Sequence, residues 1–160
     1  MRVIRLSKLA DYGIVIMTSL ARQPGQHHNA PEVAAQSHIP QPMASKILKA
    51  LARAGLLTSH RGAKGGYGLA RPAEAISVAD VISALDGPIA LTACIEDGPG
   101  GCEIEALCPA RANWQRINDA IRAALDDISM AEMSQAIPPA FGPPLLWFRR
   151  GAPGKPLGSA

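Results

Sequence analysis

Aromatic residues are scarce in this chain. They make up 4% of its 160 residues, although hydrophobic residues make up 48%. Alanine and leucine dominate that share, which suits helices that pack through small side chains. No uninterrupted apolar run reaches the roughly 18 residues of a membrane-spanning helix, and the start of the sequence, Met1–Lys8, lacks the apolar stretch of a secretion signal. We therefore expect a cytoplasmic protein without a membrane partner.

Cysteine is equally scarce, and its three occurrences, Cys94, Cys102 and Cys108, lie within one short segment. An odd number of thiols cannot all pair into disulfides, and the cytosol keeps thiols reduced. Clustered cysteines in that compartment indicate metal or redox chemistry. The segment is rich in glycine, which lets the backbone turn around a metal centre. We predict a thiolate-bound metal centre; buried cysteines that act as small apolar residues are the alternative.

The spacing of the cysteines favours an iron–sulfur cluster over structural zinc. Zinc knuckles use closely paired cysteines, whereas seven and five residues separate these three. The pair Cys108-Pro109 also occurs at the end of ferredoxin motifs. Zinc and a metal-free thiol switch remain alternatives. Every histidine precedes residue 61, so a carboxylate must be considered as the fourth ligand: Glu96, Asp97, Glu103, Glu105 or the distant Asp11.

Helical periodicity and chain breakers predict a small helical unit over residues 1–75. Three helices are expected, over residues 7–21, 31–37 and 41–54, with Ser7 and Asn29 as N-terminal caps. Two short extended segments follow, over residues 56–61 and 67–71, with a glycine-rich turn between them. Two helices joined by a short turn and followed by a basic hairpin are the order of a winged helix-turn-helix.

A second unit is expected over residues 76–133. It begins at Ser77, which has a capping box spacing to Asp80, and it contains the cysteine loop and a long helix over residues 110–130. An apolar stripe follows that helix at intervals of three and four: Trp114, Ile117, Ile121, Leu125 and Ile128. So narrow a stripe is typical of a seam between two helices. We predict dimerisation there; packing onto its own domain is the alternative.

The fold class predicted is mainly α, a winged helix-turn-helix with a long C-terminal dimerisation helix. Residues 134–160 are rich in proline and glycine, and we expect this tail to be disordered. We find no Ser/His/Asp set, no phosphate loop and no paired acid/base carboxylates, so an enzyme is not expected.

Residues off the apolar stripe of the third helix suggest contact with double-stranded DNA: Gln41, Ser45, Lys46 and Lys49. The first two suit base edges, and the lysines suit phosphates, which add affinity without sequence information. In the hairpin, Arg61 suits a minor groove, and Lys64 adds a further cation. The net charge of +3 permits such a partner. A solvated basic face, or an iron–sulfur assembly or electron-transfer module that binds no DNA, is the alternative.

Three segments resemble the IscR/NsrR-type winged-helix iron–sulfur transcription regulators. They are the opening Arg5-Leu-Ser-Lys-Leu-Ala-Asp11-Tyr-Gly, the hairpin string from Gly55 to Arg71, and the three-cysteine loop before a long helix. The similarity covers about residues 2–130 and is greatest to the subgroup that regulates SUF iron–sulfur assembly. It implies a homodimer that binds promoter DNA, expected to be a repressor, under the control of a labile cluster.

The resemblance also implies the ligands. Cys94, Cys102 and Cys108 match the cluster cysteines of the family. Some members place a histidine three residues after the last cysteine, which Arg111 excludes here. Nitric-oxide-sensing members use an aspartate of the partner subunit, and Asp11 is at the matching position; a charge that favours the first helix turn is the alternative. An oxygen ligand favours 4Fe-4S, with 2Fe-2S or zinc as alternatives. Alternative functions are a thiol redox switch and a nitric-oxide or oxygen sensor.

Overall fold

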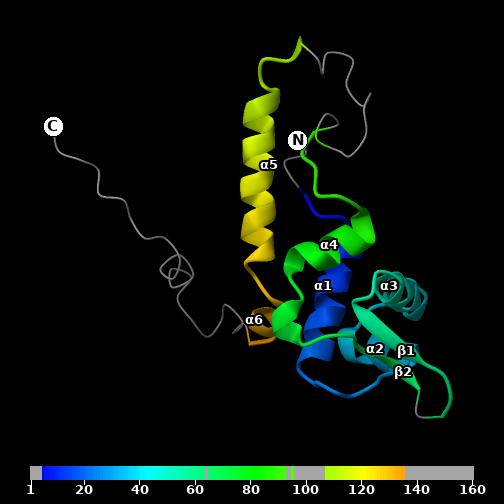
Figure 1. The fold of residues 1–160 in the computed structure, drawn as a ribbon. Helices are drawn as coiled ribbons and strands as arrows, with labels where there is room; N and C mark the ends of the chain where they lie inside the picture. Colours follow the sequence, from blue (N-terminus) through cyan, green and yellow to red (C-terminus); the bar gives the residue numbers. More distant parts are fainter. Residues whose placement is uncertain (1–4, 64, 93–94, 96–106, 136–160) are drawn as a thin grey trace, which may run out of the picture.

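The computed structural model describes residues 5–63, 65–92, 95 and 107–135. The elements in chain order are α1 (Lys8–Ala21), α2 (Ala30–Ser37), α3 (Gln41–Arg53), β1 (Leu57–His60), β2 (Gly66–Leu69), the 3-10 turn η1 (Ala73–Ala75), α4 (Val78–Asp86), α5 (Arg111–Asp126) and α6 (Met130–Gln135). Helices α1–α4 and α6 pack with the β1–β2 hairpin into one body, and α5 rises away from it (Figure 1). The predicted winged helix-turn-helix order is confirmed. The tail predicted over residues 134–160 has its first two residues in α6, and its remainder lies outside the described residues.

Local hydrogen bonds start three of the helices where the sequence predicts. The Ser7 hydroxyl accepts from the Ala10 N–H at 3.0 Å. Asn29 and Glu32 form a capping box at α2, in which each side chain accepts from the other residue's backbone N–H. The same box joins Ser77 to Asp80 at α4. Each such cap stabilises a helix by about 1 kcal/mol.

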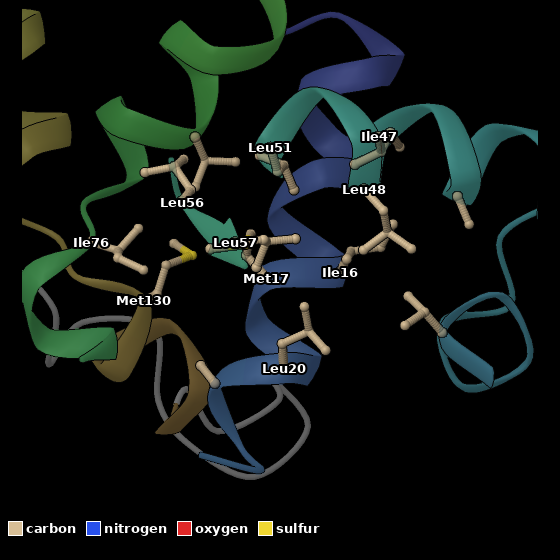
Figure 2. Packing of buried hydrophobic residues seen from close by; sticks show 14 of the residues in the cluster. Ile16, Met17, Leu20, Ile47, Leu48, Leu51, Leu56, Leu57, Ile76 and Met130 are labelled. Atoms are coloured by element: carbon tan, nitrogen blue, oxygen red, sulfur yellow. The ribbon is translucent and has the colours of Figure 1, made fainter. Parts of the chain in front are cut away.

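The core of the body lies between α1, α3, α4 and α6. Its largest fully buried side chains include Met17 of α1, Leu48 of α3 and Met130 of α6. Figure 2 shows Ile76 beside Met130, Leu57 between Met130 and Met17, and the α3 leucines Leu48 and Leu51 above Met17. The apolar stripe of α3 is wider than Met43, Ile47 and Leu51, because Ala44 and Leu48 are also fully buried while Met43 is only half-buried.

The helix predicted over residues 110–130 ends four residues early in the structure, and a second helix begins at residue 130. Helix α5 ends at Asp126, and α6 begins at Met130. Ser129 accounts for the break, because its hydroxyl accepts from the Glu132 N–H at 3.2 Å and its N–H donates to the Glu132 carboxylate at 2.9 Å. This is a new capping box, and it turns the fully buried Met130 into the core.

The chain is tied to itself at this break. The Val78 N–H donates to the Ile128 carbonyl at 2.9 Å, and the Met130 N–H donates to the Ile76 carbonyl at 2.8 Å. Ser77 and Ser129 thus form an antiparallel bridge. Helix α5 therefore leaves the body at a fixed point beside the start of α4. Within the described part of the chain, no helix is long and apolar enough to cross a membrane.

Candidate nucleic-acid interface and cysteine loop

Helix α3 presents the residues that the sequence predicts for DNA contact. Gln41, Lys46 and Lys49 are exposed and Ser45 is half-buried, while the opposite side of α3 is buried in the core. No side chain caps α3, its N-cap residue is Pro40, and its first turn holds no acidic residue. Pro42 carries no N–H, so the donors of that turn that could bind a phosphate are the backbone N–H groups of Gln41 and Met43.

The turn between α2 and α3 is tight. His38 adopts a left-handed conformation, with φ of 56°, and its N–H donates to the Ala34 carbonyl. Ile39 follows with its side chain buried. This local geometry holds α3 across α2, the arrangement of a helix-turn-helix.

The hairpin β1–β2 forms the wing, defined here as residues 57–69. Its strands are antiparallel, with Leu57 opposite Leu69 and His60 opposite Gly66. A Cβ atom at Gly65 would lie 2.3 Å from the His60 carbonyl oxygen, so the turn needs glycine there. Arg61 is exposed at the tip. Lys64 lies outside the described residues.

A third segment, which the sequence analysis missed, joins the wing. His28 exchanges two backbone hydrogen bonds with Tyr67, at 3.0 and 2.8 Å. The His28 side chain is buried, whereas His27 is exposed and its ring meets the His60 ring edge-on at 4.7 Å. Two adjacent histidines show no alternation of polar and apolar residues in the sequence, so no local signal predicts this pairing. This pairing fixes the wing beside the N-terminal end of α2.

An ion pair joins Arg71, two residues after the wing, to α4. Arg71 lies 2.8 Å from the Asp80 carboxylate, which also accepts from the Ser77 N–H. Both side chains are well exposed to solvent, so the pair alone contributes no more than about 1 kcal/mol. The pair connects the chain that follows the wing to the first turn of α4.

The described part of the cysteine loop places Cys108 at the start of α5. Its thiol is free and half-buried, two residues before the N-cap residue Ala110. Cys94, Cys102 and the four loop carboxylates lie outside the described residues. Asp11 is exposed in the first turn of α1. Among the described residues, no three His, Cys, Asp or Glu side chains gather into a metal-binding group, so Asp11 as ligand stays a prediction that concerns a second subunit.

The apolar stripe of α5 is covered at one end and open at the other. Leu125 and Ile128 pack against the core of the body. Trp114 and Ile117, nearer the N-terminal end, are 40% and 44% exposed. Packing of α5 onto the body thus accounts for Leu125 and Ile128. It leaves Trp114 and Ile117 uncovered by the described part of the chain.

A basic helix-turn-helix with an attached wing defines a winged-helix DNA-binding protein. The family model for Rrf2, an iron-dependent transcriptional regulator, matches residues 6–136. Because that match covers most of the sequence, this chain belongs to the Rrf2 family. The assignment confirms the resemblance to IscR-type regulators, and it confirms a regulator rather than an enzyme.

Several members of the family are similar to this chain along most of its length. The transcriptional regulator CymR of Bacillus subtilis is 31% identical over 132 residues, 81% of this chain and 89% of CymR. Its structure, that of a global cysteine regulator, has a TM-score of 0.65 at 28% identity and covers 83% of this chain and 98% of its own. The oxidized form of Staphylococcus aureus CymR has a TM-score of 0.63 at 31% identity and covers 84% and 99%. IscR of T. potens has a TM-score of 0.63 at 27% identity and covers 82% and 87%.

Proposed function

We propose that this protein is a homodimeric repressor that binds promoter DNA and responds to a labile iron–sulfur cluster, and that it controls genes of SUF iron–sulfur assembly. The carrying observation is the position of Cys108. It lies two residues before the N-cap of α5, the helix whose open apolar stripe suits a second subunit and whose other end enters the DNA-binding body. A single helix therefore connects a sensor at the start of α5 to the DNA-binding body.

The donor set suits a cluster. Cys94, Cys102 and Cys108 supply three thiolates, the ligands that iron–sulfur clusters prefer, and Asp11 of the partner subunit is the proposed fourth ligand. The exposure of the Asp11 side chain leaves it accessible to a second subunit. An oxygen ligand favours the 4Fe-4S form. When bound, the cluster supplies a centre that oxygen or nitric oxide alters; the protein residues hold it and connect it to α5.

The connection to DNA binding runs through the break at residues 127–129. The backbone bonds between Ile128 and Val78, and between Met130 and Ile76, join the end of α5 to the start of α4. Asp80, in that first turn of α4, pairs with Arg71, two residues after the wing. A tilt of α5 would therefore reorient the wing. Allosteric couplings of about 1–3 kcal/mol change affinity some 5- to 150-fold.

Dimerisation would place two α3 helices on one duplex. Two copies that join through the open stripe of α5, centred on Trp114 and Ile117, bury an apolar surface that neither copy covers alone. Winged helices paired in this way read half-sites about one helical turn, roughly 34 Å, apart.

Purification without oxygen tests the cluster. We expect a brown protein that contains iron and sulfide and loses its colour in air, and a Cys108→Ala variant that contains neither. Promoter affinity, measured at fixed salt, should differ between the two proteins. A colourless wild-type protein that resists reconstitution, or a Cys108→Ala variant with full iron content, would refute the cluster.

A thiol redox switch on the same fold is the second candidate. The half-buried free thiol of Cys108 favours it, as does the oxidized form in which the S. aureus relative is known. It predicts that iron-free protein changes its DNA affinity on treatment with peroxide and recovers with dithiothreitol. The cluster sensor predicts no such reversible change in iron-free protein.

A further inference from the structure

Asn118 is an exception on α5. Every other residue from Arg111 to Asp126 is exposed or half-buried, whereas Asn118 is 4% exposed. It lies between Ile117 and Ile121 of the apolar stripe and two turns after the start of α5. A buried amide costs free energy unless its polar atoms are paired, so its partners explain its presence.

Both partners belong to the segment that leads from α4 to the cysteine loop. The Asn118 side-chain amide donates from Nδ2 to the Ile89 carbonyl at 3.0 Å. Its Oδ1 accepts from the Leu91 N–H at 3.1 Å. The two backbone groups flank Ala90, so one side chain satisfies a donor and an acceptor of the segment and fixes its register along α5.

The segment also borders a pocket. Residues 87–92 line a cavity of about 440 Å³ together with α4, α5 and the arm before α1, which contributes Arg5 and Leu6. Among the described residues, side-chain packing around the segment is therefore incomplete. The hydrogen bonds to Asn118 are correspondingly important for holding the segment in place.

The segment leads into the cysteine loop, so its hydrogen bonds to Asn118 also connect that loop to α5. Leu91 precedes Cys94 by three residues, and Cys108 lies two residues before the N-cap of α5. Helix α5 thus holds both ends of the cysteine loop, one through its own start and the other through Asn118. A change in the loop reaches α5 at two points that are two turns apart, which is sufficient to tilt a helix rather than merely pull its end.

We propose that Asn118 is the positioning residue that sets the geometry of the cysteine loop on α5 and makes the helix respond to the cluster. This inference rests on the proposed cluster function. The role is assigned to the hydrogen bonds of the Asn118 amide and not to the volume of its side chain. Substitutions that keep the volume and remove the hydrogen bonds therefore test it.

The experiment compares two isosteric variants with a control on the same helix. Asn118→Leu removes both hydrogen bonds, and Asn118→Asp keeps the acceptor for Leu91 while losing the donor to Ile89. Gln115→Ala, an exposed residue one turn earlier, is the control. Each full-length protein is purified without oxygen, and its cluster is followed by visible circular dichroism and by the rate of absorbance loss in air.

We expect Asn118→Leu to lose the cluster about 10- to 100-fold faster than the wild type, since two hydrogen bonds of about 1 kcal/mol each are removed. Asn118→Asp should be intermediate, and Gln115→Ala unchanged. The circular dichroism of the bound cluster should change in both Asn118 variants, a readout that a general loss of stability does not move. The ratio of holo to apo promoter affinity should shrink in the same order.

The outcomes distinguish this inference from the proposed function. A wild-type protein without iron refutes the proposed function, and the cluster role of Asn118 with it. A wild-type protein that holds a cluster, together with Asn118 variants whose cluster spectrum and lifetime are unchanged, refutes only the role of Asn118. If Asn118→Leu does not fold, judged by far-ultraviolet circular dichroism, Asn118→Asp decides the question by the same two readouts.

Discussion

The body and helix α5 are stabilised in different ways. In the body, α1 buries six of its residues and α3 buries four, and both contribute to one continuous core. Helix α5 is longer than either, yet Asn118 is its one buried residue. An amphipathic helix of this length in water is marginal unless its apolar face is covered. The body thus explains its own stability, while α5 needs a surface from outside the described chain.

The largest effect should follow from damage to the body. Leu48→Ala removes a fully buried side chain at the centre of the core, and we expect the free energy of unfolding to fall by about 3 kcal/mol. Urea denaturation at two protein concentrations measures it. If the loss were below 1 kcal/mol, the core would not be the source of stability that the comparison assumes.

Damage to the open stripe of α5 should act on association instead. Ile117→Asp places a charge on the 44% exposed position, and we expect the dimer dissociation constant to rise by about 100-fold or more. Sedimentation measures it, with the exposed Arg116→Ala as the control. An Ile117→Asp protein that stays dimeric at low micromolar concentration would contradict a seam along α5.

Substitutions on the DNA-binding surface of the body should change DNA affinity without damaging the core. Lys49→Ala removes an exposed cation of α3, so affinity should fall about equally for all duplexes and the salt dependence should lose about one counterion. Gln41→Ala should instead reduce the preference for one base pair, by about 1–3 kcal/mol. Fluorescence anisotropy over a salt series tests both. If salt dependence and base-pair preference were both unchanged in these variants, α3 would not be the surface that contacts DNA.

The smallest effect concerns the junction between the two regions. Hydrogen bonds from the Ser129 backbone and side chain lower the pKa of Glu132 below 4.5. A lowered pKa in the folded state means that the ionised carboxylate adds stability above pH 4.5, which is lost as the pH falls through the lower, folded value. Glu132→Gln should therefore be slightly less stable than the wild type at neutral pH. Urea midpoints of the two proteins should converge in acid; a gap that widens there would exclude this role for Glu132.

Local chemistry is what the sequence predicted well. The caps at Ser7, Asn29 and Ser77 follow from hydrogen bonds between residues three apart, so short patterns suffice to predict them. The glycine turn of the wing was predictable for the same reason. The order of these elements was enough to predict the winged helix-turn-helix.

The missed features depend on contacts between distant residues. The pairing of His28 with Tyr67 spans a helix-turn-helix, and no local pattern encodes it. The break before Met130 was hidden because Ile128 continues the period of the stripe, although Ser129 and Glu132 carried a capping signal. Asn118 gave one cue, a polar residue between Ile117 and Ile121. The cysteine spacing favours an iron–sulfur cluster over zinc as the metal centre. The arrangement of the ligands around that centre depends on residues outside the described part and on a second subunit.

The bridge between Ser77 and Ser129 has a consequence for how this chain tolerates change. The stretch from Ser77 to Ser129 begins and ends at this bridge, so its two ends stay together whatever the length between them. For a flexible loop with fixed ends, the closure entropy grows slowly, and each doubling costs only about 0.6 kcal/mol. Insertions around the cysteines should therefore cost the body little stability. The length of the stretch between Ser77 and Ser129 can then vary while the DNA-binding surface stays the same.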